Sequence, residues 1–180
     1  EHHKVAADLQ PLEKKFSTLL PTDANKVVLA QYDAKQLYYL QFSNRGEKFD
    51  VAADPEITLY NEYFGGGMNT IVFQEMREAR GLAYTAWATL ATPSNANGDY
   101  SYYAFIATQN DKMQKAVEAF DDIINNMPES EAAFKLAKEA VLTNLRTSRT
   151  IKDEVLWKYI ANKDLGVTED RNKAIFEKVQ

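Results

Sequence analysis

Apolar and polar residues alternate, or form short β-branched runs, mainly in the first half of the chain. Residues 27–31 and 37–43 are rich in Val, Leu and Tyr, and they predict two strands that form a hairpin. Two longer runs, 82–91 and 99–108, flank a segment with a proline and an Asn-Gly pair, which is typical of a turn. The pattern therefore predicts an antiparallel sheet with this second hairpin at its centre.

After residue 110, apolar residues recur at three- and four-residue steps, as on the buried face of a helix. Short polar side chains that precede these segments are expected to begin the helices. The expected starts are Asn110 or Asp111, Ser130, Asp153 and Thr168. In the first half, Asp54 and Pro55 open a helix toward Phe64, and a short helix is expected from 11 to 19. Strands followed by helices predict an α+β fold, an antiparallel sheet with helices packed on one face.

Composition narrows the classes of function. The 180 residues carry a net charge of −5 and no cluster of Lys and Arg, which disfavours a nucleic-acid surface. No segment reaches the ~18 uninterrupted apolar residues of a membrane span. There are no cysteines, so disulfides and thiolate chemistry are excluded. A single soluble domain is expected from this length and composition.

The segment from residue 63 to 84, YFGGGMNTIVFQEMREARGLAY, is the strongest candidate site. Its glycines Gly65, Gly66 and Gly67 permit close backbone approach, and Asn69 is expected to cap a helix that starts near Thr70. Gly81 is expected to end that helix. Arg77 near the helix end and Tyr84 at the start of the next strand are separated by a short turn. We therefore expect these two side chains to converge.

The segment from residue 63 to 84 also has two other interpretations. A Gly-rich turn before a helix can bind phosphate, but the Lys-Ser/Thr of a P-loop is missing here. The glycines could simply form a tight turn between two helices. Arg77 and Tyr84 also have an ordinary structural interpretation. An arginine near a helix end usually interacts with the helix dipole, and a tyrosine in a strand usually packs its ring against neighbours.

The chain offers few other catalytic groups. His2 and His3 are its only histidines and are adjacent at the terminus, so they cannot form an i, i+4 metal pair. A zinc site with His and Cys ligands cannot be assembled, and a serine nucleophile has no internal histidine as its base. Paired carboxylates such as Asp121 and Asp122 are explained by solvated helix surfaces. This chain alone is therefore not expected to hydrolyse peptides.

The segment contains, in this order, a Gly-rich turn, the pattern F-x-E-x-R-E-x-x-G-L-x-Y and a following strand. This series resembles the C-terminal halves of the insulinase/pitrilysin family, whose members are zinc peptidases with an inverted His-x-x-Glu-His motif. The likeness continues from Pro128 to Lys138 and covers about residues 27–180. It implies that Arg77 and Tyr84 act at a catalytic cavity as catalytic and substrate-binding residues, with Gly65, Gly66 and Gly67 also lining the substrate site. The zinc is implied to lie in a partner half, in the same parent chain or in another subunit, and the substrate to be a peptide.

The resemblance also implies an organisation. Residues 1–26 are expected to be a helical lead-in, and residues 27–180 a half-domain that is truncated at its C-terminus. Two rival functions stay open. The chain could be a non-catalytic assembly subunit, like the core proteins of respiratory complexes that resemble this family, or a peptide-binding module that uses exposed strand edges.

Overall fold

The computed structural model of the chain describes residue 8 and residues 19–180. Within them, the strands are β1 (Gln36–Ser43), β2 (Thr85–Ala91) and β3 (Ser101–Gln109). The helices are α1 (Asp54–Phe64), α2 (Ile71–Phe73), α3 (Met113–Asn125), α4 (Glu131–Thr147), α5 (Lys152–Asp164) and α6 (Arg171–Val179). Short 3₁₀ turns η1 (Val51–Ala53) and η3 (Asn110–Lys112) precede α1 and α3, and a π-helical turn η2 (Gln74–Ala79) extends α2.

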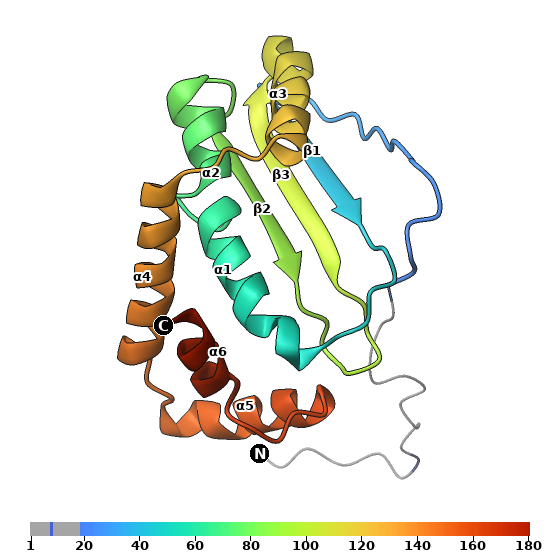
Figure 1. The fold of residues 1–180 in the computed structure, drawn as a ribbon. Coiled ribbons are helices and arrows are strands. Elements are labelled where there is room, and N and C mark those ends of the chain that lie inside the picture. Colours follow the sequence, from blue (N-terminus) through green and yellow to red (C-terminus); the bar gives the residue numbers. More distant parts are fainter. Residues whose placement is uncertain (1–7, 9–18) are drawn as a thin grey trace, which may run out of the picture.

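The sheet is antiparallel with the strand order β1-β3-β2. Helices α1, α2 and α3 lie over one face of it (Figure 1), which confirms the predicted α+β class. The predicted hairpin of β2 and β3 is present, but only β3 is central, because β1 pairs with its other side. In the described part of the chain, no helix is long and apolar enough to cross a bilayer.

The main core lies between the sheet and these three helices. Large side chains from the helices fill it, and small ones from the strands let the helices approach closely. The fully buried large members are Phe64, Val72, Met76, Ile106, Phe120 and Ile123. A second, smaller apolar cluster joins α4 to α6 through Val141, Leu142, Ile175 and Val179.

The outer edge of β2 is covered by the end of α1 and the turn after it. The Ala88 N–H donates to the Gly65 carbonyl at 3.1 Å. The Leu90 N–H donates to Asn61 Oδ1 at 2.8 Å, and Asn61 Nδ2 donates to the Leu90 carbonyl at 3.0 Å. A side-chain amide thus takes the place of a neighbouring strand, and the free edge is satisfied.

Tyr63 ties α1 to the connection between α3 and α4. Its hydroxyl donates to the Pro128 carbonyl at 2.7 Å and accepts from the Ser130 N–H at 3.0 Å. Ser130 is the predicted helix cap, and its Oγ accepts from the Ala133 N–H at 3.2 Å. One phenol therefore fixes the position at which α4 starts.

The predicted strand at residues 27–31 is wrong. This run has no strand partner among the described residues, and its apolar side chains are almost fully exposed, with Val28 at 89% and Leu29 at 91%. A strand needs a neighbour for its backbone hydrogen bonds, and β1 pairs with β3 instead of folding back on this run. The predicted helix at 11–19 falls almost entirely outside the described residues.

Some predicted caps are also wrong. Neither Asn110 nor Asp111 caps α3, because both lie within the 3₁₀ turn η3, and the residue before α3 is Lys112, which makes no side-chain cap. Thr168 does not cap α6 either. The cap is Asp170, whose Oδ1 accepts from the Asn172 N–H at 3.0 Å.

Replacing Asp170 with Ala is expected to lower the free energy of unfolding by about 1 kcal/mol, because an N–H at the start of α6 loses its acceptor. Urea denaturation measures the change. Thr168→Ala is the matched control, since Thr168 is exposed and is expected to change stability by less than ~0.5 kcal/mol. Equal effects of the two variants would contradict the assignment of the cap.

Candidate functional site

The glycine turn joins α1 to α2, and its three glycines differ in what they do. Gly65 is buried, and a Cβ placed on it would lie 2.1 Å from the Ala88 carbonyl oxygen. A Cβ on Gly66 would lie 3.0 Å from the Asn61 oxygen, and one on Gly67 would meet no atom within 4 Å. Close packing on β2 therefore requires glycine only at residue 65, and residues 66 and 67 form an exposed loop.

The helix after this turn starts where predicted, but Asn69 does not cap it. Thr70 is the residue before the first helical turn, and no side-chain hydrogen bond caps that turn. The Thr70 hydroxyl instead donates back to the Gly67 carbonyl at 2.7 Å. After Phe73 the helix widens into η2, and it ends at Gly81, whose φ of +57° suits glycine as predicted.

Arg77 and Tyr84 come together at the end of this helix, as their spacing predicts. Arg77 lies in η2 with its Cζ 5.8 Å from the centre of the Tyr84 ring and 5.0 Å from the centre of the Phe73 ring. The Tyr84 N–H donates to the Ala107 carbonyl at 2.8 Å, just before β2 begins, so the backbone of the tyrosine is held by the sheet. A cation over an aromatic ring is a favourable contact that aligns both side chains.

Both side chains remain open to solvent. The Tyr84 residue is 69% exposed, and the Arg77 side chain is 46% exposed. Within the described part of the chain, the Tyr84 hydroxyl has no hydrogen-bond partner, and Arg77 has one weak ion pair, 3.6 Å from its Nε to Glu78 Oε1. The pair thus presents a phenol O–H and a guanidinium fork as unused hydrogen-bond donors.

The structure does not bring the glycines into contact with this pair. Gly65 is bonded to Ala88, which follows Tyr84 by four residues on β2, a separation of roughly 13 Å along a strand. The glycine turn and the Arg77–Tyr84 pair therefore lie at separate places along this edge of the sheet.

An ion-pair brace holds η2 against α3 next to this pair. Arg80 Nη2 lies 3.3 Å from Asp122 Oδ2, and Arg80 Nε lies 3.4 Å from Glu75 Oε2. The Asn126 amide, which donates to Asp122, and the Arg80 guanidinium together hold the pKa of the Asp122 carboxyl below its usual range. The Asp122 carboxylate is therefore charged near neutral pH. In this state it pairs with Arg80, at the end of the helix that carries Arg77.

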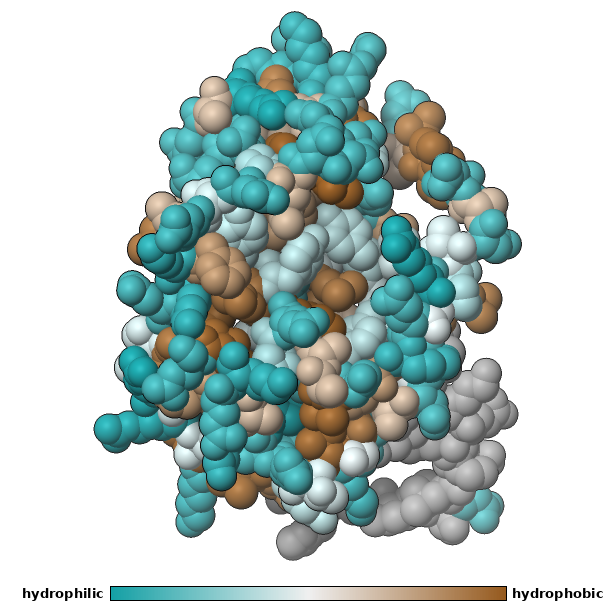
Figure 2. Space-filling view, in the orientation of Figure 1, coloured by the Kyte–Doolittle hydropathy of each residue, from teal (hydrophilic) through white to brown (hydrophobic). Residues whose placement is uncertain are grey.

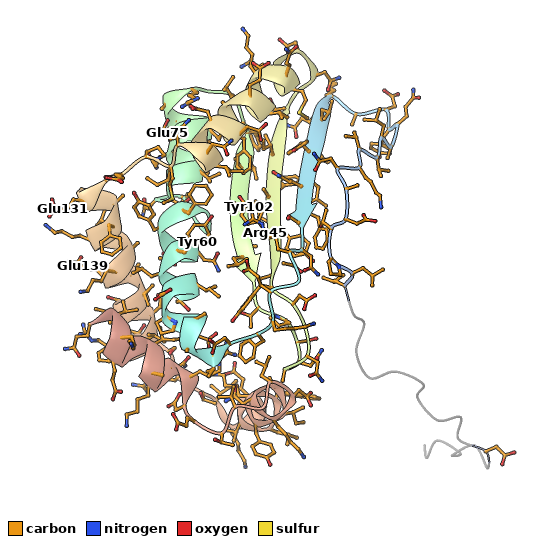
Figure 3. All side chains as sticks on the ribbon, turned by 45° about the vertical axis from the view of Figure 1, so that its right-hand side comes forward. Arg45, Tyr60, Glu75, Tyr102, Glu131 and Glu139 are labelled. Atoms are coloured by element: carbon orange, nitrogen blue, oxygen red, sulfur yellow. The ribbon has the colours of Figure 1, made fainter. Side chains whose placement is uncertain are left out.

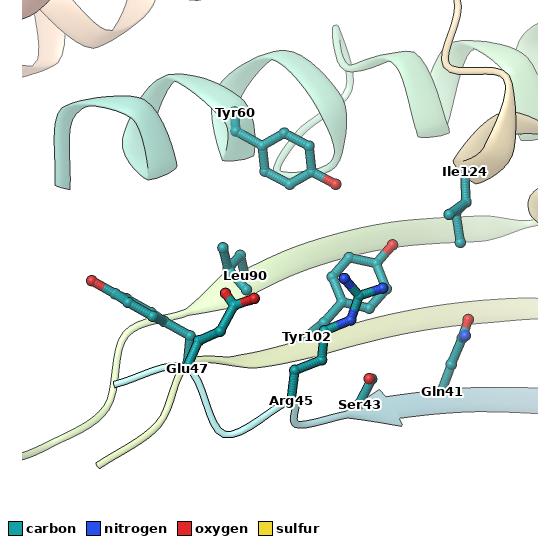
Figure 4. Close-up of a pocket in the computed structure, with 9 residues that line it drawn as sticks. Gln41, Ser43, Arg45, Glu47, Tyr60, Leu90, Tyr102 and Ile124 are labelled. Atoms are coloured by element: carbon teal, nitrogen blue, oxygen red, sulfur yellow. The ribbon is translucent and has the colours of Figure 1, made fainter. Parts of the chain in front are cut away.

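A pocket of about 350 Å³ lies between α1 and the sheet, away from the pair (Figure 4). Tyr60 reaches into it from α1, and Gln41, Arg45 and Tyr102 reach into it from the sheet side, as Figure 3 also shows for the two tyrosines. Gln41 Oε1 and the Tyr102 hydroxyl are buried there without a hydrogen-bond partner in the described residues. Burial raises the pKa of the Tyr102 phenol, so it stays neutral.

Sequence reasoning missed this pocket. Its signal was present in the strict alternation of β1, where Tyr39 packs against the core while Gln41 and Ser43, on the same face, line the pocket. Polar residues at inward-facing strand positions indicate a cavity or a missing partner. The pocket has unsatisfied polar atoms but no connection to Arg77 or Tyr84.

Comparison with known proteins settles the family. The model of a family described as "Peptidase M16 inactive domain" matches residues 4–141, more than half of the chain. The chain belongs to this family. It is the C-terminal, non-zinc type of domain of the insulinase family, as the segment from residue 63 to 84 predicts.

A solved structure supports the fold of this M16 inactive domain. It is the crystal structure of a peptidase M16 inactive domain from Pseudomonas fluorescens, with a TM-score of 0.64 and 16% sequence identity. The match covers 83% of this chain and 35% of that one, so the chain spans about a third of the length of its structural neighbour. Comparison with curated proteins finds no matching sequence.

In residue 8 and residues 19–180, no group of three or more His, Cys, Asp or Glu side chains is arranged to hold a metal ion. His2 and His3 lie outside the described residues. The described site offers a pair of hydrogen-bond donors, which can stabilise negative charge.

Proposed function

We propose that this chain is the non-metal half of a zinc peptidase, in which Arg77 and Tyr84 complete a site whose zinc is held by a partner half. The observation that carries the proposal is the exposed Arg77–Tyr84 pair of this M16 inactive domain. Its Tyr84 hydroxyl and Arg77 guanidinium both have unused hydrogen-bond donors. The partner half lies either in the same parent chain or in another subunit.

The chemistry of amide hydrolysis explains what the two residues would do. Attack of zinc-bound water on a peptide carbonyl produces a tetrahedral oxyanion, and positioned donors stabilise that charge more than the starting carbonyl. In this proposal the Tyr84 O–H donates to the oxyanion. Arg77 is permanently charged and forked, so it binds substrate backbone carbonyls beside the scissile bond. The exposed Gly66 and Gly67 leave room for the peptide backbone to pass.

An exposed apolar helix supports the need for a partner. Helix α5 has no buried residue, and four of its apolar side chains, Val155, Leu156, Trp157 and Tyr159, are between 56% and 69% exposed. Apolar side chains concentrated on one element are typical of a protein–protein contact. This feature supports association equally for a peptidase half and for a non-catalytic assembly subunit, so it does not separate the two.

The test is reconstitution with the zinc-bearing half of the parent protein. The proposal expects that neither half alone cleaves a fluorogenic peptide, that the mixture does, and that removal of zinc with 1,10-phenanthroline abolishes the cleavage. A complex that forms but never cleaves would contradict the peptidase role and favour the assembly subunit. Peptide binding by this chain alone, without any complex, would favour a binding module.

In the active mixture, Arg77→Lys is expected to raise KM about tenfold or more, because an ammonium cannot hold two carbonyls in the plane of a guanidinium. Steady-state kinetics with the same peptide measures the effect. Arg149→Lys is the control, since Arg149 is exposed outside the site and its change is expected to leave KM unaltered. Equal KM values for Arg77→Lys and the wild type would remove Arg77 from substrate binding.

A further inference from the structure

The pocket between α1 and the sheet lies where the helices leave part of the sheet open. Helix α1 lies along β2, where the hydrogen bond between Ala88 and Gly65 holds it, and α3 lies toward the other end of the sheet (Figure 1). Neither helix lies directly over the C-terminal end of β1. Over the middle of this face, apolar and weakly polar side chains reach the surface among hydrophilic ones (Figure 2). The cavity of about 350 Å³ is within the usual size of a small-molecule site.

The pairing of the strands places polar side chains on the floor of this cavity. Ser43 lies opposite Tyr102, and Tyr102 lies opposite Leu90, so these three form one row across the sheet. Gln41 lies in the next row on the same face, opposite Ala104. Alanine fills little space in that row, so Gln41 and Ser43 border the cavity instead of packing against a large neighbour.

Several hydrogen-bonding groups around this cavity have no partner among the described residues. The side chains of Gln41, Ser43 and Tyr60 line the cavity and make no hydrogen bond there. The Gln41 Oε1 and the Tyr102 hydroxyl are also buried. Buried polar groups cost free energy unless they are paired, and most of them in folded proteins are paired. The floor of the cavity is therefore suited to a ligand that brings its own hydrogen-bond donors and acceptors.

Two unpaired charges of opposite sign stand at the mouth of the cavity. Arg45 and Glu47 follow β1 at alternate positions, and both side chains line the cavity (Figure 4). Both residues are exposed, and neither forms an ion pair with the other or with any described residue. The neighbouring Lys48, by contrast, is paired with Asp99. A ligand that carries one positive and one negative group would pair with both charges at once.

We propose that this cavity binds a free α-amino acid with an uncharged polar side chain, of which glutamine is the best fit. Its α-carboxylate pairs with the Arg45 guanidinium and its α-ammonium with the Glu47 carboxylate. The side-chain amide of the ligand lies over the floor, where its oxygen accepts from Gln41 and its NH₂ donates to the hydroxyl of Ser43 or Tyr60. Apart from Arg45 and Glu47, the residues around the cavity are uncharged, so the side chain of glutamate or lysine would find no partner there. The inference is independent of the proposed peptidase role.

The placement of the two charges favours a free amino acid over a peptide. Arg45 and Glu47 are two residues apart, so their Cα atoms are separated by no more than about 7 Å. A free amino acid carries its ammonium and its carboxylate on one carbon atom. In an extended peptide of three or more residues the two terminal charges are farther apart than this, and an internal segment carries neither of them.

Isothermal titration calorimetry with the full chain and free L-glutamine tests the proposal. Saturable binding of one glutamine per chain is expected, with a Kd of about 1 mM or tighter. N-acetyl-glutamine lacks the ammonium and glutamine α-amide lacks the carboxylate, so each is expected to bind about tenfold more weakly or worse. L-glutamate, L-lysine and the tripeptide Gly-Gln-Gly are also expected to bind more weakly. Absence of glutamine binding, or equal binding of the N-acetyl form or of the tripeptide, would overturn the proposal.

Variants of the chain locate the bound glutamine. Arg45→Gln and Glu47→Gln each remove one charge at an exposed position, so each is expected to weaken glutamine binding about tenfold or more without altering the circular dichroism spectrum or Tm. The matched controls are Arg149→Gln and Glu169→Gln, two exposed charges outside the cavity, and both are expected to bind like the wild type. Unchanged affinity in both Arg45→Gln and Glu47→Gln would place the ligand elsewhere and overturn the proposal.

Discussion

Replacing Tyr84 with Phe is expected to lower kcat about a hundredfold in the complex of this chain with its zinc-bearing half, with little change in KM. The substitution removes one oxygen atom from a side chain that is 69% exposed and whose hydroxyl has no partner in the described residues. The ground state therefore loses no intramolecular hydrogen bond, and the ring keeps its contact with Arg77. A donor that acts only on the oxyanion affects the transition state alone, which separates this result from a loss of substrate binding.

The matched control is Tyr32→Phe, another exposed tyrosine, which lies before β1 and outside both the Arg77–Tyr84 site and α5. It is expected to leave kcat unchanged and to keep the complex intact in size-exclusion chromatography. Unchanged turnover of Tyr84→Phe in a complex that still needs zinc would remove the oxyanion role, whatever the effect of Arg77→Lys.

Replacing Gly65 with Ala is expected to lower the free energy of unfolding by about 3 kcal/mol, at the upper end of the usual effect of overpacking. A Cβ at this position would lie 2.1 Å from the Ala88 oxygen and 2.8 Å from the Ala88 nitrogen, and a backbone strand cannot move aside as a flexible side chain can. The α1–α2 turn would separate from β2 and break the hydrogen bond between Ala88 and Gly65. Urea denaturation followed by circular dichroism measures the loss.

Gly67→Ala is the control within the same turn. A Cβ there meets no atom within 4 Å, and Gly67 is not among the glycines with positive φ. The substitution is expected to change stability by less than ~0.5 kcal/mol. If both variants have equal stability, the close approach of Gly65 to β2 does not contribute to the fold.

The sequence predicts the site best where its parts are close along the chain. Arg77 and Tyr84 are separated by one glycine-terminated turn, so their convergence follows from local geometry. The same holds for the β2–β3 hairpin and for the cap at Ser130. Family membership was likewise visible in one continuous segment. The catalytic roles of Arg77 and Tyr84 stay predictions until a zinc-bearing half is tested with them.

Structural features that depend on residues far apart in the sequence are less predictable. The run at 27–31 has the composition of a strand, but whether it pairs depends on a neighbour that its own sequence does not specify. Thr168 and Asp170 both have side chains able to cap a helix, and the structure places Asp170 directly before the first turn of α6. The pocket of Gln41, Arg45 and Tyr102 combines residues from distant strands and loops, so the polar positions on the inward face of β1 indicate a cavity but not the residues that complete it.

The connectivity of the sheet has a consequence for how the chain folds. β2 and β3 are joined by a short turn and can pair early, whereas β1 pairs with β3 across roughly sixty residues or more and must wait for it. During synthesis β1 leaves the ribosome first, and its uncharged apolar sequence stays unpaired until the whole β2–β3 hairpin has emerged. We therefore expect β1 to be the segment through which a newly made chain is recognised by chaperones or aggregates.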